Sequence, residues 1–326
     1  MCKVTVLVAA YNAGPYITRC IESLKAQTLT DWEAVCVDDA STDDTLQKLD
    51  NLASGDRRIQ VIHLDENQGQ AHARNVGLRM ACGQYICMLD SDDWFSEDAL
   101  EKAAATLDAH EQTDSVLFQV REVYADHERL YPMPDFDVMT GEEAFERSLT
   151  WQIHGLYMVR ATIHKSIPYD DSSRAYSDDN TTRMHYLSSR EVRQCQGVYF
   201  YRQHQESVTH KVGMRRFDFL RANESMRRQM EEAAVGERLI RLYERERWLN
   251  LIGTYMFYYF HRNSFAPSQR QYALEEMRRV WLTIDMKAIP WRLKLKPGYM
   301  PLRPYWTLFR MQEELYFWLR KTIKGR

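Results

Sequence analysis

Tyr85-Ile86-Cys87-Met88-Leu89-Asp90-Ser91-Asp92-Asp93 places three carboxylates directly after a short apolar run. The run predicts a buried strand, and no turn residue separates the strand from the acids. Carboxylates packed at the end of a strand are electrostatically costly unless a cation neutralises them. Oxygen ligands suit Mg²⁺ or Mn²⁺, which bind through one or two carboxylates together with a substrate's phosphates. The alternative is a helix N-cap, with Asp92 or Asp93 capping a segment that starts near Ser96.

The sequence around this stretch alternates between strand-like and helix-like segments. Apolar runs predict strands at residues 4–9, 32–37, 59–63, 85–89 and 116–120, and helical spacing predicts helices at 17–24, 46–52, 71–80 and 100–107. The alternation predicts an α/β fold with a mostly parallel, doubly wound sheet flanked by helices. Beyond residue 125 the pattern breaks into short apolar pieces, with a possible edge strand at Val198–Tyr201.

Helical patterns without strand signals begin near residue 214 and continue through most of the remaining chain. We therefore expect a sheet domain at 1–212, with a first half at 1–110 and a second half at 111–212. A helical C-terminal region at 213–326 is expected to extend it. A chain of 326 residues is long enough for one large domain or two smaller ones.

Composition is typical of a soluble globular protein, with 44% hydrophobic and 27% charged residues. Six cysteines without a CxxC pair predict reduced thiols in the cytoplasm, and neither a disulfide framework nor a zinc site. We also expect neither a signal peptide nor a spanning segment. Residues 1–110 carry 18 Asp and Glu against 9 Lys and Arg, which disfavours nucleic-acid binding. Residues 280–326 carry 10 Lys and Arg against 3 Asp and Glu, so this end could meet an anionic partner.

Chemically distinctive residues follow three of the predicted strands. Tyr11 follows the first strand, Asp38 and Asp39 the second, and the acids from Asp90 the fourth. Because ligands bind at the carboxyl ends of strands in open α/β sheets, we expect these residues along one edge. A planar ring suits the base of a nucleotide, a hydrogen-bond acceptor suits its ribose, and a metal site suits its diphosphate. The first loop has neither a GxGxxG nor a GxxxxGK pattern, so a metal ion must take the role of a glycine cradle.

Four motifs in order make a family resemblance specific. They are Val6-Leu7-Val8-Ala9-Ala10-Tyr11-Asn12, Val37-Asp38-Asp39-Ala40-Ser41-Thr42-Asp43, Asn67-Gln68-Gly69-Gln70-Ala71-His72-Ala73-Arg74-Asn75-Val76-Gly77 and Leu89-Asp90-Ser91-Asp92-Asp93. Together they resemble the nucleotide-binding half of family 2 glycosyltransferases, which have the GT-A fold. The resemblance covers roughly residues 2–110, about a third of the chain, and implies a nucleotide-binding half at 1–110 and an acceptor half at 111–212.

The resemblance implies a role for several residues of these motifs. The residues assigned to the donor site are Ala9, Tyr11, Asp39, Arg74 and Asp90. Asp39 would accept a hydrogen bond from uracil, Tyr11 would lie beside the base, and Arg74 close to the nucleotide. Asp90 and Asp92 form the D-x-D motif, in which Asp92 ligates Mn²⁺ or Mg²⁺. The alternatives are a turn residue for Asp38, a solvated helix face for Arg74 and packing for Tyr11.

Transfer of a sugar also needs a carboxylate base that takes the proton of the acceptor hydroxyl. Tyr176-Ser177-Asp178-Asp179-Asn180 resembles the family's Glu-Asp motif, which implies that Asp179 is the base. Asp178 stands where the family usually has Glu, which leaves open which of the two faces the acceptor. Asp170-Asp171 is the rival pair, and an acidic loop is the alternative for it.

Tyr201-Arg202-Gln203-His204-Gln205-Glu206-Ser207 resembles the family's YRxHxxS element, which closes over the donor. The resemblance implies that Arg202 and Ser207 contact the diphosphate and that His204 meets the diphosphate or the metal. A cation here would offset the charge of the leaving group. The alternative is an exposed polar turn that follows an edge strand.

The resemblance implies an inverting, metal-dependent glycosyltransferase of the hexosyltransferase type. We expect a UDP-sugar donor, a glycan or lipid-linked acceptor and a role in surface polysaccharide assembly. Aromatic residues interleaved with Lys and Arg beyond residue 280 suit contact with the inner face of a membrane, or a packed helical cap. Two other functions stay open: a non-catalytic partner subunit that binds nucleotide-sugars, and a sugar nucleotidyltransferase.

Overall fold

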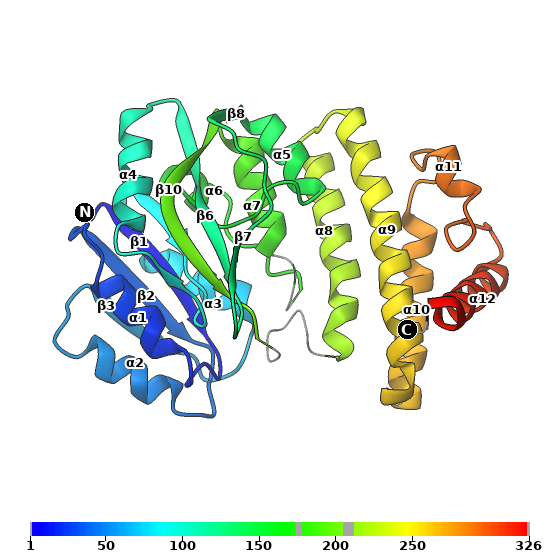
Figure 1. Cartoon of the computed structure of the whole chain (residues 1–326), viewed down its shortest axis with the longest axis horizontal. Helices are drawn as coiled ribbons and strands as arrows, with labels where there is room; N and C mark the ends of the chain where they lie inside the picture. Colours follow the sequence, from blue (N-terminus) through cyan, green and yellow to red (C-terminus); the bar gives the residue numbers. More distant parts are fainter. Residues whose placement is uncertain (1, 174–175, 177, 205–211, 325–326) are drawn as a thin grey trace. The chain divides into compact units, whose positions relative to one another are not determined.

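The computed structural model describes residues 2–173, 176, 178–204 and 212–324. The chain divides into two compact units, Met1–Ser207 and Val208–Arg326. The first unit is built on one sheet with helices around it, and the described part of the second is helical (Figure 1). The predicted α/β class with a helical C-terminal extension is confirmed.

Four neighbouring strands of the first unit run parallel, in the order β3-β2-β1-β4. Their bounds are β1 (Val4–Ala10), β2 (Trp32–Asp38), β3 (Ile59–His63) and β4 (Tyr85–Met88). Every residue of β1 and β2 is buried. Burial on both faces explains why these segments are continuously apolar instead of alternating.

Helices cover both faces of this parallel half. Their bounds are α1 (Ile17–Lys25), α2 (Thr45–Ala53), α3 (Gln70–Met80) and α4 (Ala99–Ala109). Val4 and Val6 of β1 share a hydrophobic cluster with residues of α1, α2 and α4, whereas Leu7 shares one with residues of α3. Helix α3 lies so close to the sheet that a Cβ on Gly77 would be 3.3 Å from Leu7 Cδ2. Each side of β1 is therefore sealed by its own set of helices.

The other half of the sheet is mixed, because β9 enters antiparallel between β4 and β6. Strand β10 is parallel to β6 and antiparallel to β5 and β8, while β7 pairs with β6. The bounds in this half are β5 (Trp94–Phe95), β6 (Thr113–Val123), β7 (Glu128–Leu130), β8 (Val138–Thr140), α5 (Gly141–Leu149), β9 (Tyr157–Arg160), α6 (Ala161–Ser166), α7 (Asp178–Ser188) and β10 (Glu191–Arg202).

The possible edge strand at Val198–Tyr201 is an interior strand instead. It belongs to β10, which pairs with β6 on one side and with β5 and β8 on the other. The side chain of Tyr199 is fully buried, and its hydroxyl donates to Asp93 Oδ2 at 2.9 Å. An aromatic residue with a polar tip resembles an edge residue in sequence, but here its hydroxyl has an interior partner.

The second unit packs its helices around aromatic side chains. Their bounds are η1 (Met214–Phe217), α8 (Asp218–Glu232), α9 (Glu237–His261), η2 (Arg262–Ser264), α10 (Pro267–Thr283), α11 (Trp291–Lys294) and α12 (Trp306–Lys324). Trp248, Trp281 and Phe309 are buried in one cluster. The indole N–H groups of Trp248 and Trp281 donate to the carbonyls of Tyr299 and Pro301. The tryptophans thus anchor the segment between α11 and α12 as well as filling the core.

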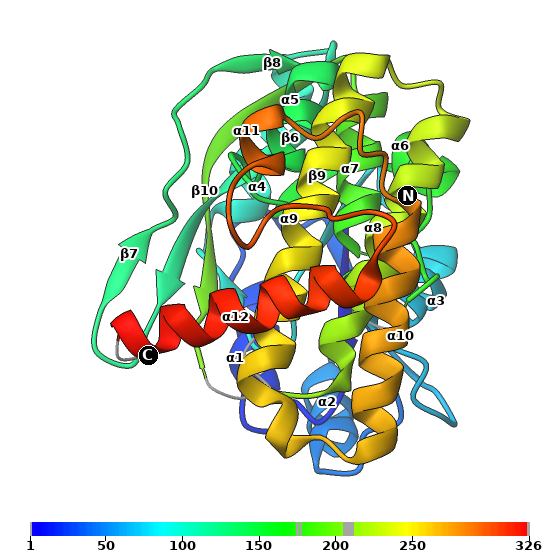
Figure 2. The ribbon, with the colours of Figure 1, turned by 90° about the vertical axis from the view of Figure 1, so that its right-hand side faces the viewer.

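Helix α12 lies across α9 (Figure 2), and among the described residues one of its faces is apolar and exposed. Phe309, Glu313 and Phe317 are buried on its inner side. The outer residues are between 42% and 78% exposed and recur every three or four positions, which puts them on one face. We call this face the α12 stripe: Leu308, Met311, Leu315, Trp318, Leu319 and Ile323. Among the described residues, no helix combines the length and hydropathy needed to cross a membrane.

Candidate active site

The ends of three adjacent parallel strands meet at one edge of the sheet. Strand β1 lies between β2 and β4, so the loops that follow these strands are neighbours. Ala9 is a buried residue of β1, Tyr11 in the following loop is 43% exposed, and Asp39 directly follows β2. The expected convergence of these strand ends is confirmed, and it places Tyr11 and the acids in one region.

Side chains join the first two loops to each other. The Asn12 side-chain oxygen accepts from the amide of Thr42 at 2.8 Å, and the Asn12 amide donates to Ser41 Oγ at 2.9 Å. The Gly14 amide donates to Asp43 Oδ2 at 3.0 Å. These loops therefore hold each other in position before any ligand arrives.

Asp39 is buried and fixes the loop ahead of α3. Its two carboxylate oxygens accept from the amides of Gln68 and Gly69, each at 2.8 Å. A carboxylate has about four acceptor positions, so Asp39 can still accept a further hydrogen bond. Gly69 has φ of 97°, a conformation that strains any residue with a Cβ. Asp38 is also fixed, because it accepts from the Ser41 amide and contacts His63 Nδ1 at 2.9 Å.

Arg74 joins acids from two distant parts of the sequence. Its guanidinium donates to Asp90 Oδ1 and, at 3.0 Å, to Asp178 Oδ2, while Arg74 itself is only 2% exposed. The solvated-face alternative for Arg74 is therefore wrong. Burial acts to lower the pKa of Arg74, but the two carboxylates raise it overall. Burial raises the pKa of Asp90, and the Arg74 charge opposes that rise.

Asp92 and His204 face each other at the same edge. Asp92 Oδ2 lies 2.8 Å from His204 Nε2, and the backbone carbonyl of Asp92 accepts from Arg202 Nε at 2.8 Å. The other ring nitrogen, His204 Nδ1, is buried without a hydrogen-bond partner among the described residues. A carboxylate oxygen and an imidazole are ligand types that Mn²⁺ accepts, so these two residues fit a divalent cation. Arg202 also stacks over the Trp94 ring at 4.8 Å, which fixes its position.

The N-cap alternative for the acids after β4 is wrong. Helix α4 begins at Ala99 with Asp98 at its N-cap, beyond both Asp92 and Asp93. Asp93 instead lies fully buried, where Oδ1 accepts from the Arg202 amide at 2.7 Å and Oδ2 from the Tyr199 hydroxyl. Burial, with the neighbouring Asp92 and Asp90 carboxylates, raises its pKa well above the ordinary value. Asp93 thus ties the acidic loop to β10, a link that its position directly after the D-x-D motif could have suggested.

Asp178 and Asp179 begin helix α7. Asp178 pairs with Arg74. Because Asp179 is the next residue in the chain, it is held close to the same group of charges. Burial, reinforced by the Asp178 carboxylate, raises the pKa of Asp179 to about 7. A carboxyl group with a pKa near neutrality is suited to take up a proton at physiological pH.

Asp170 and Asp171, the rival pair for the base, lie in a loop and have other contacts. Asp170 Oδ2 accepts from the Asn180 side chain at 2.7 Å, and Oδ1 accepts from the Ser172 amide at 3.0 Å. Asp171 is exposed. These contacts support the acidic-loop alternative for Asp170-Asp171. Ser207, the remaining residue assigned to the donor site, lies outside the described residues.

Two relatives share sequence with the N-terminal third of the chain. Glycosyltransferase GlyG of Streptococcus pneumoniae serotype 4 (strain ATCC BAA-334 / TIGR4) is 38% identical over 98 residues, which are 30% of this chain and 33% of GlyG. Chondroitin synthase of Escherichia coli is 43% identical over 98 residues, 30% of this chain and 14% of that protein. The matched segment is thus a third or less of either relative.

The fold extends the likeness to nearly the whole chain. The crystal structure of S. aureus TarS in complex with UDP-GlcNAc superposes with a TM-score of 0.72 at 21% identity, over 96% of this chain and 91% of that one. At this identity the likeness shows the fold, which is GT-A. The sequence model described as "Glycosyl transferase family 2" matches residues 5–169, which is half of the chain. That span contains the three converging strand ends and Arg74, and this chain belongs to glycosyl transferase family 2.

Proposed function

We propose that this protein is an inverting glycosyltransferase that moves a hexosyl group from a UDP-sugar to a hydroxyl of a saccharide or lipid-linked saccharide. The observation that carries the proposal is the Arg74 bridge between Asp90 and Asp178. It brings the acids of the nucleotide edge and the start of α7 to one place. A donor diphosphate and an acceptor base must be neighbours in a single displacement, and a bridge between these acids supports such an arrangement.

The donor would bind along the edge formed by β2, β1 and β4. Tyr11 is exposed enough to lie against a base, and Ala9 lines the end of β1 below it. Asp39 keeps acceptor capacity for a uracil N–H while its present bonds hold the loop before α3. Arg202 would offset diphosphate charge, and Ser207 is proposed as a further diphosphate contact.

Asp92 and His204 would hold a divalent cation, Mn²⁺ or Mg²⁺. Their ligand atoms already face each other at 2.8 Å, and a few protein ligands suffice when substrate phosphates complete the shell. When bound, such a cation supplies positive charge against the negative charge that develops on the departing diphosphate. Asp90 stays committed to Arg74 and positions the acidic loop from which Asp92 projects.

Asp179 would act as the general base. Asp178 would help to position it, because the ion pair of Asp178 with Arg74 holds the start of α7 in place. The acceptor hydroxyl gives its proton to the Asp179 carboxylate as its oxygen attacks the anomeric carbon. The bond between that carbon and the UDP oxygen breaks with its electron pair on UDP, and attack from the opposite face inverts the configuration. A pKa near 7 suits this role, since the carboxylate form is available at neutral pH and is basic enough to bind the proton.

A panel of nucleotide-sugars with Mn²⁺ tests the proposal, with hydrolysis and transfer followed by release of the nucleoside diphosphate. We expect turnover of at least one UDP-sugar. Asp92→Ala should lose metal-dependent donor binding, and Asp179→Asn should keep it while losing about two to four orders of magnitude in rate. Asp171→Asn is the matched control and should be near normal. Tight UDP binding without turnover would indicate a non-catalytic partner, and pyrophosphate release from UTP and a sugar phosphate a nucleotidyltransferase.

We further propose that the α12 stripe contacts an anionic membrane surface, so that the enzyme works on the cytoplasmic face in surface polysaccharide assembly. The stripe is apolar and uncovered among the described residues, and Trp318 is an aromatic residue of the kind found at membrane interfaces. Charge supports this choice of partner, because residues 280–326 carry 10 Lys and Arg against 3 Asp and Glu. The acids of α12 do not oppose it, since Glu313 is buried and Glu314 pairs with Arg262.

A further inference from the structure

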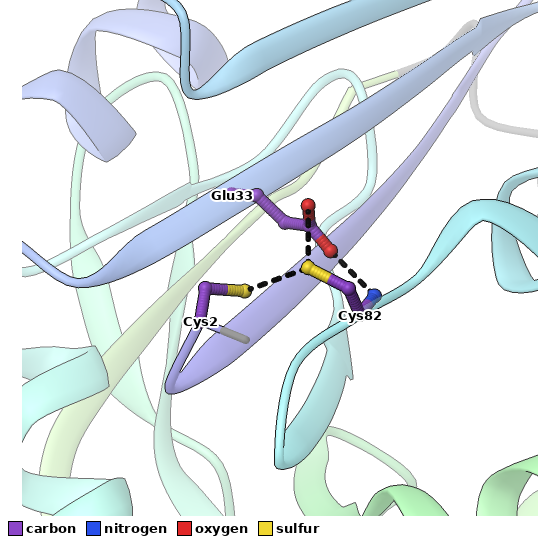
Figure 3. Close-up of side chains that lie close together, drawn as sticks. All are labelled: Cys2, Glu33 and Cys82. Carbon is purple, nitrogen blue, oxygen red and sulfur yellow. Dashed lines mark hydrogen bonds between the residues drawn. The ribbon is translucent and has the colours of Figure 1, made fainter.

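A second group of potential ligands lies at the opposite end of the sheet from the acids. Cys2 precedes β1, Glu33 is the second residue of β2, and Cys82 lies in the loop between α3 and β4 (Figure 3). All three are at the amino ends of neighbouring parallel strands. The two sulfur atoms are 3.5 Å apart, and Cys82 Sγ is 3.1 Å from Glu33 Oε2. One ligand atom from each residue falls within 4.8 Å of the others.

Glu33 is a positioned carboxylate without a counter-charge. It is 8% exposed, and its Oε1 accepts from Thr5 Oγ1 at 2.6 Å and from the Cys82 amide at 2.7 Å. Burial acts to raise its pKa, but these hydrogen bonds lower it overall, so the group is an anion at neutral pH. Among the described residues, no Lys, Arg or His side chain pairs with it. A buried carboxylate that faces two thiols and has no ion pair among the described residues can accept a cation without giving up another partner charge.

We propose that Cys2, Glu33 and Cys82 bind a thiophilic divalent cation, and that zinc is the ion that fits them best. Two thiolates and one carboxylate are ligands that zinc takes in tetrahedral sites. With Zn–S bonds of about 2.3 Å, tetrahedral geometry needs sulfurs about 3.8 Å apart, a few tenths more than they are here. Cys82 is exposed, so water can reach the fourth position. Binding releases the two thiol protons to solvent and leaves the ion held by three anionic ligands.

The ion joins three segments that are distant in the sequence. It holds the chain before β1, the start of β2, and the loop just after Met80, where α3 ends. The ion would therefore stabilise the position of α3 against the sheet, while its three protein ligands leave the fourth position to water. Soft sulfur ligands also separate it from the proposed site at Asp92, where the protein offers a carboxylate and an imidazole and the substrate offers phosphate oxygens.

Cobalt titration of the reduced, metal-free full-length chain tests the proposal. A C-terminal tag without histidines keeps Cys2 clear of foreign ligands. We expect one Co²⁺ per chain with the sulfur-to-cobalt absorption of two thiolates, its displacement by one equivalent of Zn²⁺, and no displacement by excess Mg²⁺. Zinc should also raise the unfolding temperature, because it binds only the folded arrangement. Absence of the sulfur-to-cobalt absorption would refute the site.

Three variants and a control assign the ligands. Cys2→Ser and Cys82→Ser should each halve the cobalt–thiolate absorption and weaken zinc binding at least tenfold. Glu33→Gln should keep the absorption and still weaken binding about tenfold. The control Cys195→Ser removes a buried thiol of β10 and should leave zinc binding unchanged. Unchanged affinity in Cys82→Ser, or equal loss in the control, would overturn the assignment.

A measurement on the unaltered chain covers the case in which a variant fails to fold. Zinc should slow alkylation of Cys2 and Cys82, mapped by mass spectrometry, and leave the rates at the other four cysteines as they were. Equal alkylation with and without zinc, or a Cys2–Cys82 disulfide formed in the presence of zinc, would contradict metal binding. None of these readouts depends on sugar transfer, so this proposal can fail while the proposed function stands.

Discussion

Arg74 brings a permanent positive charge into the interior, and two carboxylates 88 positions apart in the chain match it there. Asp90 comes from the end of β4 and Asp178 from the start of α7. The planar guanidinium can serve both acids at once because its N–H groups point in fixed, separate directions. At the scale of single residues, this side chain joins the acidic end of β4 to the start of α7.

Arg74→Ala should be strongly destabilising, by about 3–5 kcal/mol, because it leaves two carboxylates near each other without their partner. Arg74→Lys should recover part of the stability and little of the activity, since one ammonium cannot reproduce the forked contact. Urea unfolding and donor turnover measure the two effects. Arg79→Ala is the matched control, because Arg79 is exposed on the same helix and should cost less than 0.5 kcal/mol. A loss at Arg74 no larger than at Arg79 would exclude the bridging role.

The pKa of Asp179 leads to a prediction about pH. Turnover should rise as pH increases through about 7, where Asp179 becomes the carboxylate that accepts a proton. Asp179→Asn should remove this rising limb along with most of the rate. If the limb persists in the variant, another group is titrating.

The contribution of Asp179 to the free energy of unfolding should fall as pH rises, in contrast to turnover. A folded-state pKa above the ordinary value means that the folded chain binds this proton more tightly than the unfolded chain. The stabilisation is complete below the ordinary pKa of 3.8 and is lost as pH rises through about 7. The Asn variant should therefore gain stability over the natural chain as pH rises, and thermal unfolding at pH 5 and pH 8 measures the gain.

The sequence predicted the individual acids better than their partners. Asp39 and Asp90 could be placed at one edge because each directly follows an apolar strand and the strands alternate with helices. The pairing of Arg74 with Asp178 spans 104 positions and depends on how α7 packs, which no local pattern encodes. The contact between Cys2 and Cys82, which are 80 positions apart, could not be predicted because it also depends on how distant segments pack.

At the scale of elements, α3 connects the site to the sheet. Its N-terminus is fixed by Asp39 through the amides of Gln68 and Gly69, and its middle rests on the sheet at Gly77. Arg74 lies between these two contacts. A displacement of α3 would therefore move the guanidinium that holds both Asp90 and Asp178.

Gly69→Ala should test this coupling. The backbone at φ 97° suits glycine and costs about 1–2 kcal/mol with a Cβ, so stability should fall by that amount. Affinity for UDP should also fall, because the amide that binds Asp39 shifts with the loop. Gly55→Ala is the control, since Gly55 also has positive φ but lies outside these contacts. Calorimetric UDP titration of both variants measures the difference, and equal affinities would refute the link between Gly69 and the donor site.

The elements of the second half were harder to predict. Strand β9 has only four residues, Tyr157–Arg160, and its place between β4 and β6 depends on pairing with both. A segment of that length has too little periodicity to distinguish a strand from a helix. The apolar pattern of Val198–Tyr201 predicts only a possible edge strand, whereas the segment lies within β10 and pairs on both sides.

At the scale of the whole chain, charge is divided between its ends. The acidic excess lies in residues 1–110 and the basic excess in 280–326. The exposed apolar residues of α12 occur within the basic part. Basic charge beside an exposed apolar face is the combination expected of a segment that contacts an anionic membrane surface.

The chain should sediment with vesicles that contain anionic lipid and less with neutral vesicles, and added salt should weaken binding. Leu315→Glu and Trp318→Glu together should reduce binding at least tenfold by removing apolar area and adding charge. Met80→Glu and Leu130→Glu, at exposed apolar positions outside α12, form the matched control. Equal pelleting of both double variants would exclude the α12 stripe as the contact, and self-association detected by ultracentrifugation would assign it to a second copy.

Strand β9 has a consequence for how the fold can be divided. It inserts a segment from beyond residue 150 between two strands that precede residue 124. A fragment that stops at residue 110 would leave the amide and carbonyl groups along one margin of β4 bare, and a bare apolar margin invites pairing with other chains. Residues 1–110 and residues 111–212 are thus interleaved in the sheet rather than joined end to end. Exchange of acceptor specificity between relatives should succeed by loop grafting and fail by swapping contiguous blocks of sequence.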